Sequence, residues 1–294
     1  MEVLAMFLAG MSAVGCAVLA LQQRRLRRRV RQAEAAAKSA QRRVRALAVL
    51  HAEQIAHEAL RSAGRTPRLP FRFTSGSGED LFLFHLFSGA IEGRYIEVGA
   101  FDGVTHSVTY PFEALGWTGL LIEPLPARAA ACAKARPNSR TVHAALSEPG
   151  CPAVITLTQV GQGERSEKMS YVETTDRHRK IMRDRGPRTS IEVPCTTMNA
   201  LLSEEPPGHP GIDFAVIDVE GGEAALLRGF DLRRHRPRVL VVEDKSDGAD
   251  TTVRTLVESQ GYVCAGRIAE NLVLIRADET ELIARAGTLV DRPG

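Results

Sequence analysis

The sequence predicts an α/β domain with a mostly parallel sheet, and three observations support this prediction. From about residue 70, short apolar runs alternate with helical stretches, which is the pattern of parallel strands joined by crossover helices. The 294 residues are 44% hydrophobic and 25% charged, typical of a globular protein with a substantial core. Glycine or acidic residues directly follow several apolar runs, at the strand ends where such sheets bind ligands.

The N-terminal segment differs from the rest in hydropathy and charge. Residues 3–21 carry no charge, and a helix of that length nearly spans a ~30 Å hydrocarbon layer. An arginine-rich run follows at 24–31, whereas only Glu2 precedes the apolar run. A cleaved signal peptide would have its positive charge before the apolar run. We therefore expect residues 1–23 to be an uncleaved, single-pass membrane anchor, with the rest of the chain facing the cytoplasm.

A heptad pattern follows the predicted anchor. Apolar residues recur at alternating spacings of four and three, at Leu26, Val30, Ala33, Ala37, Ala40, Val44 and Leu47. The pattern predicts a basic helical stalk over residues 24–65. Two interpretations stay open: a coiled coil that self-associates and contacts anionic lipid through its arginines, or a solvated linker helix. Gly64 and Pro67 end the predicted helix, so we expect the main domain over residues 66–294.

Charge and cysteine usage exclude several classes of protein. Residues 22–64 carry 11 basic and 3 acidic side chains, whereas residues 65–294 carry 27 and 31. The main domain is therefore slightly acidic, and we expect no nucleic-acid partner. The five cysteines are dispersed without a CxxC pair, which argues against a zinc ribbon or a disulfide framework and suits a reducing compartment.

The main domain is predicted to contain eight strands and five helices. The strands are expected at residues 95–98, 119–122, 140–144, 154–158, 214–217, 239–242, 262–264 and 272–275. The helices are expected at residues 79–87, 127–136, 198–202, 222–228 and 251–259.

A glycine-containing turn follows the first of these strands. Gly99 and Gly103 flank a tight turn that contains Asp102 and lets a ligand approach the main chain. The turn lacks the GxGxxG spacing and the P-loop lysine, so a pyrophosphate cradle is not indicated. Glu123 ends the next strand about 20 residues later, where an acidic side chain can bind both hydroxyls of a ribose. The two features together predict a nucleoside site.

Acidic residues also cluster after the later strands. Asp218, Glu220 and Glu223 follow the strand at 214–217, and Glu243 begins a further acidic pair after the next strand. Crowded carboxylates raise at least one pKa and favour a general base or a metal site. No ligand spacing supports a metal, so none is expected. Glu223 has an equally good structural interpretation, in which it opens the next helix.

The motifs resemble those of the FkbM-type methyltransferase family. The resemblance rests on YIEVGAFDG at 95–103, FEALGWTGLLIEP at 112–124, VPCTTM at 193–198 and IDFAVIDVEGGE at 212–223, in the family's block order, and on Glu243. It implies a Rossmann-like methyltransferase domain that uses S-adenosylmethionine. It also implies that Glu97, Gly99 and Gly103, with Asp102 in the same turn, bind the methionine end of the cofactor while Glu123 binds its ribose. The acceptor implied is a hydroxyl of a sugar, glycan or polyketide-like molecule.

This chemistry needs a base as well as the cofactor site. Methyl transfer from a sulfonium is an in-line displacement, for which the protein supplies positioning and a proton acceptor. Asp218 or Glu220 is the first candidate, because each follows a central strand. His106, in the loop after Gly103, is the second candidate, because imidazole titrates near neutral pH.

Two other functions stay open beside this one. The glycine turn and Glu123 would also suit a nicotinamide-dependent oxidoreductase, and the domain could be an inactive, membrane-tethered scaffold. Residues 160–190 carry eight basic and five acidic side chains. They form either a lid over an acidic or phosphorylated acceptor or a solvated loop with a short exposed helix. Trp117 is expected to pack rather than to stack on a sugar.

Overall fold

The computed structural model of this chain describes residues 2–160, 188–205, 211–246 and 248–289. Within α1 only the backbone is described for residues 2–22, 24, 34, 38, 41 and 42. The chain divides into two compact units, Met1–His51 and Ala52–Gly294.

The N-terminal unit consists of one helix. Helix α1, Glu2–Ser62, runs through this unit and into the next. Leu26, Val30, Val44 and Leu47 of the heptad pattern are exposed along it. No helix among the fully described residues is both long and apolar enough to cross a membrane. The predicted span at 3–21 falls on side chains outside the described residues, so it stays a prediction, as does the coiled coil.

The second unit begins inside α1, earlier than the sequence predicted. Ala52, Ala56 and Leu60 are completely buried in the core of this unit, one helical turn apart. The helix ends where expected, followed by Gly64 in the left-handed conformation at φ 66°. The predicted boundary at 65/66 therefore marked the end of the helix, whereas the compact unit starts at Ala52, because the last turns of α1 already carry core residues.

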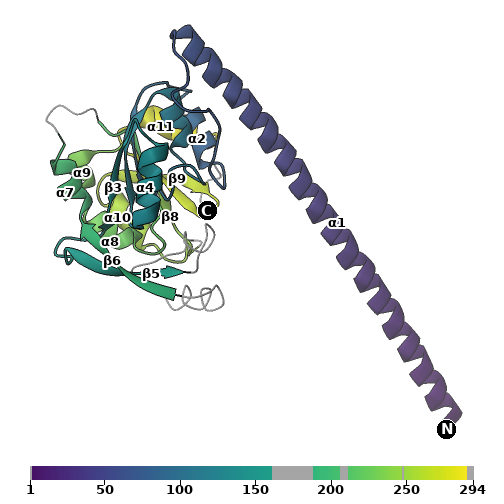
Figure 1. Cartoon of the computed structure of the whole chain (residues 1–294). Helices are drawn as coiled ribbons and strands as arrows, with labels where there is room; N and C mark the ends of the chain where they lie inside the picture. Colours follow the sequence, from purple (N-terminus) through teal and green to yellow (C-terminus); the bar gives the residue numbers. More distant parts are fainter. Residues whose placement is uncertain (1, 161–187, 206–210, 247, 290–294) are drawn as a thin grey trace. The chain divides into compact units, whose positions relative to one another are not determined.

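The second unit is built on a seven-stranded sheet with the order β3-β2-β1-β7-β8-β10-β9 (Figure 1). Its strands are β1 (Arg94–Val98), β2 (Thr118–Glu123), β3 (Arg140–His143), β7 (Phe214–Ile217), β8 (Val239–Glu243), β9 (Tyr262–Ile268) and β10 (Asn271–Arg276). Strands β3, β2, β1, β7 and β8 pair in parallel, and β10 pairs antiparallel with both β8 and β9. The predicted α/β class with a mostly parallel sheet is confirmed.

Helices cover both faces of the sheet. They are α2 (Glu79–Leu86), α3 (Tyr110–Leu115), α4 (Pro126–Ala135), α7 (Met198–Ser203), α8 (Glu223–Arg228), α9 (Leu232–His235), α10 (Thr252–Glu258) and α11 (Thr280–Ala286). Neighbouring strand residues point to opposite faces, so Tyr95 joins the core under α2 and α11, whereas Ile96 joins the core under α8 and α10. Two apolar layers therefore hold the sheet rigid from both sides.

A smaller sheet has the order β4-β6-β5, with β4 at Ala145–Leu146, β5 at Val154–Val160 and β6 at Arg188–Thr196. Strand β6 was not predicted, since it contains Pro194 and charged residues that weaken the strand pattern. Helices α3, α9 and α11, each of seven residues or fewer, were also not predicted.

The strand order reverses at β1. Strands β2 and β3 extend the sheet on one side of β1, whereas β7 pairs with its other edge. Neighbouring connections then leave in opposite directions, and a crevice opens at the carboxyl ends of β1 and β7.

Candidate active site

A cavity of about 640 Å³ lies at the carboxyl ends of the central strands. Its walls include residues 99–101 after β1, 123–125 after β2, 144–146 after β3 and 218–222 after β7. This volume is in the usual range for small-molecule sites, ~300–1,000 Å³. The sheet thus brings to one cavity loops that are up to about 120 residues apart in the sequence.

The two glycines of the first turn have different environments. Gly99 has φ 85° and lines the cavity, and a Cβ there would lie 1.9 Å from the main-chain oxygen of Asp218. Gly103 has φ 76° and packs away from the cavity, where a Cβ would lie 2.7 Å from Cγ of Arg136 and 2.9 Å from Sγ of Cys132. Only glycine fits either position.

Glu123 joins the glycine turn to the end of β2. Its Oε2 accepts the main-chain N–H of Phe101 at 2.8 Å, and its Oε1 accepts that of Leu125 at 2.8 Å. Burial raises the pKa of this carboxyl to about 7, although both N–H donors lower it. Glu123 lines the cavity, and each oxygen has a second lone pair available for a ligand hydroxyl.

Glu97 is engaged by the segment that follows the turn. Its Oε1 accepts the main-chain N–H of Val108 at 2.8 Å, and its Oε2 accepts the hydroxyls of Ser107 at 2.7 Å and Thr109 at 2.5 Å. Burial raises the pKa of this carboxyl. Glu97 lines the cavity, but three of its hydrogen bonds hold the protein's own loop.

Asp102 ties together its own turn. It accepts the main-chain N–H groups of Val104 at 2.9 Å and Thr105 at 2.7 Å, and the Thr105 hydroxyl at 2.6 Å. Asp102 and Gly103 are not among the residues that line the cavity. In this geometry they shape the turn, and their predicted contact with a cofactor stays a prediction.

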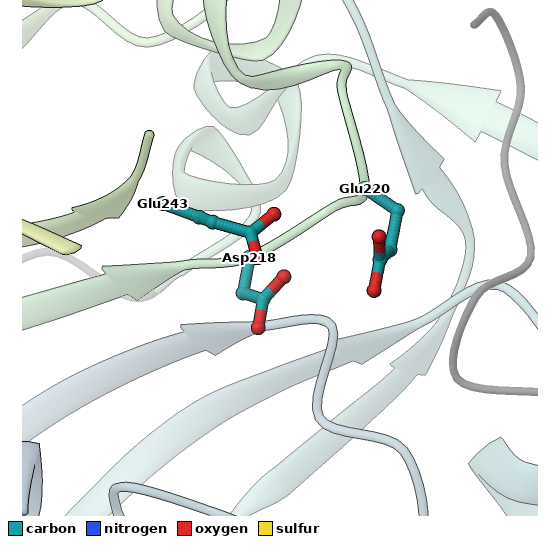
Figure 2. Close-up of side chains that lie close together, drawn as sticks. All are labelled: Asp218, Glu220 and Glu243. Carbon is teal, nitrogen blue, oxygen red and sulfur yellow. The ribbon is translucent and has the colours of Figure 1, made fainter. Parts of the chain in front are cut away.

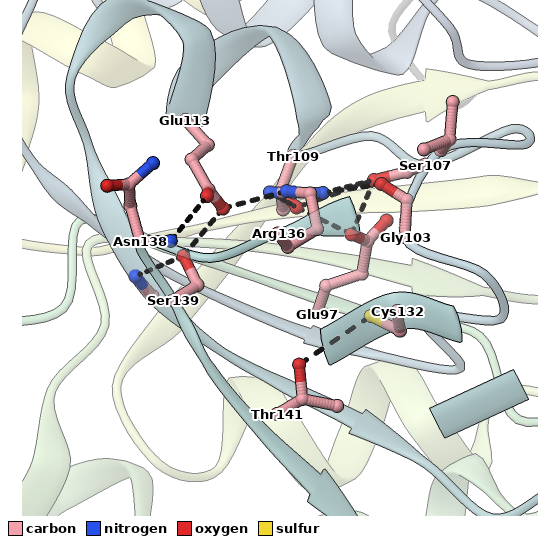
Figure 3. A network of polar contacts seen from close by, with 12 residues as sticks. Glu97, Gly103, Ser107, Thr109, Glu113, Cys132, Arg136, Asn138, Ser139 and Thr141 are labelled. Atoms are coloured by element: carbon pink, nitrogen blue, oxygen red, sulfur yellow. Dashed lines mark hydrogen bonds and ion pairs between the residues drawn. The ribbon is translucent and has the colours of Figure 1, made fainter. Parts of the chain in front are cut away.

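Sequence reasoning missed Arg136, which lies behind the turn and is completely buried (Figure 3). Its five N–H donors all have partners: Oε2 of Glu113 at 2.7 Å, the oxygen of Gly103 at 2.8 Å, and the hydroxyls of Ser107 at 3.1 Å, Tyr95 at 2.6 Å and Thr109 at 3.0 Å. Arg136 therefore fixes both the end of the glycine turn and the hydroxyls that hold Glu97. An arginine at the end of a helix gives no sequence signal for such a role.

Three carboxylates meet beyond the turn. Oxygens of Asp218, Glu220 and Glu243 lie within 4.8 Å of one another (Figure 2). Burial, with the nearby Asp218 carboxylate, raises the pKa of Glu220 to about 7 and also raises that of Glu243. The Lys245 ammonium forms ion pairs with Glu220 and, at 2.9 Å, with Glu243. Asp218 and Glu220 line the cavity, and oxygen ligands of this kind suit a divalent cation.

The loop that carries Glu220 is held in an unusual conformation. Glu220 has φ 59° and is followed by Gly221 at φ 110°. Glu223 is buried, and its side chain accepts hydrogen bonds from the main-chain N–H groups of Val219 at 3.3 Å and Gly221 at 3.0 Å. These contacts support the structural interpretation of Glu223, and they fix the loop that presents Glu220 to the cavity.

His106 lines the same cavity, with a left-handed backbone at φ 61°. The structure thus brings all three candidate bases, His106, Asp218 and Glu220, to one cavity. Trp117 is buried and donates its Nε1–H to the oxygen of Ala90 at 2.7 Å, so the expected packing role is confirmed.

The far wall of the cavity was not predicted. It comes from residues 147–152 and from Ile155 and Leu157 of β5. Most of the basic stretch predicted at 160–190 lies outside the described residues. The wall depends on the small sheet, and its main strand β6 was missed in the sequence.

The mostly parallel sheet, its reversal at β1 and the cavity at that point define a Rossmann-like α/β protein with a small-molecule site. The model of the methyltransferase FkbM domain matches residues 97–264, which is more than half of the chain. The chain therefore belongs to the FkbM methyltransferase family, as the motifs predicted.

Two solved structures share similarity with the chain. One is a TehB-like SAM-dependent methyltransferase from Corynebacterium glutamicum, with 13% identity, a TM-score of 0.35 and coverage of 77% of this chain and 97% of that one. The other is a candidate O-methyltransferase from Klebsiella pneumoniae, with 14% identity, a TM-score of 0.33 and coverage of 77% and 88%. No curated protein matches the chain.

Proposed function

We propose that this protein transfers a methyl group from S-adenosylmethionine to a hydroxyl of its acceptor. The observation that carries the proposal is that Glu123, the Gly99 turn and the two carboxylates Asp218 and Glu220 all line one cavity. A nucleoside site and a candidate base in one cavity suit a transfer from cofactor to acceptor.

The residues present fit the cofactor. Glu123 has one free lone pair on each oxygen, and two ribose hydroxyls can donate to them. Gly99 leaves the main chain open to close approach. Ala144, Ala145 and Leu146 add an apolar surface to the same cavity that suits a heteroaromatic base. A nicotinamide dinucleotide fits less well, because the turn lacks the glycine spacing that a pyrophosphate needs.

The chain's own contribution to the reaction is positioning and proton acceptance. S-adenosylmethionine, when bound, supplies an activated methyl group on its sulfonium. Glu220 or Asp218 accepts the proton that the acceptor hydroxyl loses during attack. The pKa of Glu220 is about 7, which suits a base that works near neutral pH.

We propose a hydroxyl of a sugar, glycan or polyketide-like molecule as the acceptor. The family membership and the carboxylates, which accept hydrogen bonds from hydroxyl groups, support this class.

The location of the enzyme is a separate proposal. Residues 3–21 and the arginines after them favour a single-pass anchor with the enzyme unit facing the cytoplasm. The exposed apolar side chains of Leu26, Val30, Val44 and Leu47 favour pairing of the stalk with a second copy.

Calorimetric titration tests the function. We expect S-adenosylmethionine to bind and NAD not to bind, and we expect Glu123→Ala to weaken cofactor binding. Binding of NAD alone would support the oxidoreductase, and binding of neither would support an inactive scaffold.

A further inference from the structure

The carboxylate cluster contains a cation of the chain's own. Lys245 lies two residues beyond the end of β8, and its ammonium forms ion pairs with both Glu220 and Glu243. Its side chain is 39% exposed, whereas those of Glu220 and Glu243 are 16% and 10% exposed. The ammonium therefore reaches from the surface into a partly buried acidic site.

Three carboxylates this close need a positive charge. With oxygens within 4.8 Å of one another, Asp218, Glu220 and Glu243 repel when they are ionised. Burial also weakens the solvation of Glu220 and Glu243, whereas Asp218 is exposed. In many proteins a divalent cation neutralises such a set. Here an ammonium contacts two of the three carboxylates, and it also attracts Asp218.

A metal and this ammonium would compete for the same oxygens. A divalent ion would bind at about 2.0–2.6 Å from its ligands, so it would stand close to the lysine nitrogen and be repelled by it.

We propose that Lys245 is the resident cation of this cluster. Its ammonium occupies the place of a divalent metal and positions Glu220 at the cavity. Glu220 has a left-handed backbone, and its side chain is held by the Lys245 ion pair while Glu223 holds the loop. Lys245 is thus a positioning residue, and the cluster works without a metal. The catalytic consequence rests on the proposed methyl transfer, whereas the exclusion of metal does not.

Mn²⁺ titration followed by electron paramagnetic resonance tests this proposal on the full chain in detergent. We expect wild type and Lys245→Arg to bind Mn²⁺ only weakly at the cluster. Lys245→Ala should bind at least tenfold more tightly than wild type, because it leaves three carboxylates without their cation. The double variant Lys245→Ala/Glu243→Gln should lose this binding, which shows that the new site is the cluster.

Two results would overturn the proposal. In the first, wild type binds Mn²⁺ with an affinity within tenfold of that of Lys245→Ala, and Glu243→Gln abolishes the wild-type binding. In the second, Lys245→Ala is folded but binds Mn²⁺ no more tightly than wild type. Circular dichroism checks folding, and Lys245→Gln replaces the alanine variant if that variant is unfolded. S-adenosylmethionine is titrated in parallel. Absence of cofactor binding would count against the proposed function, while the Mn²⁺ results would still decide the role of Lys245.

Discussion

Gly99 and Asp218 are in main-chain contact across the centre of the sheet. A Cβ on Gly99 would lie 1.9 Å from the carbonyl oxygen of Asp218, and the N–H of Asp218 donates to the oxygen of Val98 at 3.1 Å. The two residues follow β1 and β7, the strands at which the sheet order reverses. The turn beside Glu123 and the carboxylate loop are therefore parts of one rigid structure.

Gly99→Ala should separate these two loops. The new Cβ would overlap main-chain atoms that have no room to move, and alanine is also strained at φ 85°. We expect a loss of at least about 2 kcal/mol in the free energy of unfolding, together with lost cofactor binding. Gly261→Ala is the matched control, because it has φ 95° with nothing within 4 Å of its Cβ. It should cost only the ~1–2 kcal/mol of the left-handed conformation, and equal losses in both variants would contradict the prediction.

Glu123 should make cofactor binding depend on pH. Its pKa of about 7 means that the carboxylate, which is the better acceptor for ribose hydroxyls, is lost as pH falls below 7. We expect the affinity for S-adenosylmethionine to be about tenfold weaker at pH 6 than at pH 8. Glu123→Gln should bind the cofactor weakly and with a smaller pH dependence, because glutamine has no carboxyl group to titrate. The cofactor's own titration is common to both proteins, so it does not affect the comparison. Identical pH profiles would remove Glu123 from the site.

The raised pKa of Glu123 also makes the stability of the protein depend on pH, in the opposite direction to cofactor binding. Because the folded pKa is above the ordinary 4.5, folding favours the protonated form of Glu123. Its contribution to the free energy of unfolding is fully present below about pH 4.5 and is lost as pH rises to about 7. Cofactor binding should therefore offset a weakness of the free protein at neutral pH.

Asp218→Asn and Glu220→Gln test the base. Each substitution is nearly isosteric. The one that removes the base should leave cofactor affinity unchanged and reduce turnover by a factor of ~10²–10⁴. Glu148→Gln is a control, because Glu148 also lines the cavity but is paired with Arg228 outside the cluster. With Glu220 as the base, turnover should fall as pH drops below about 7, because burial and the nearby Asp218 carboxylate raise the pKa of Glu220 to about 7. Full turnover in both carboxylate variants would move the assignment to His106.

Arg136→Met should be among the most destabilising substitutions in this unit. It leaves Glu113 and Glu97 buried without their guanidinium, and loss of one partner of a buried pair costs ~3–5 kcal/mol. Arg140→Met removes an arginine from an exposed pair with Glu204 and should cost less than ~1 kcal/mol. Denaturant unfolding measures both, and a similar cost for the two would show that the buried network adds little.

Removal of residues 1–23 should release the protein from membranes. These residues hold the uncharged run at 3–21, which as a helix nearly spans the ~30 Å hydrocarbon layer. The arginines that remain should give only weak binding to anionic vesicles, reversed by salt. Sedimentation with membranes after a high-salt wash is the measurement, and a truncated protein that still sediments would disprove the anchor. Protease treatment of inside-out and right-side-out vesicles tests the orientation.

Local patterns in the sequence were enough to predict the main strands and the residues directly after them. The apolar runs that became β1, β2, β7 and β8 are nearly continuous, because these strands are covered on both faces. The place of Glu123 at the cavity could be predicted because its position at the end of a strand, after a glycine turn, depends only on short-range order. The place of Gly99 at the cavity could be predicted for the same reason.

Contacts between distant residues depended on the tertiary structure. Asp218 and Glu220 are two residues apart, so the sequence was enough to predict that they lie close together. Glu243 and Lys245 lie beside them only because β7 pairs with β8. Arg136, at the end of a helix, became the centre of a buried network only when α4 packed on the sheet. The start of the compact unit at Ala52 depended on which face of a continuous helix is buried. Strand order and packing decide such contacts, because residues far apart in the chain meet only when the sheet has formed.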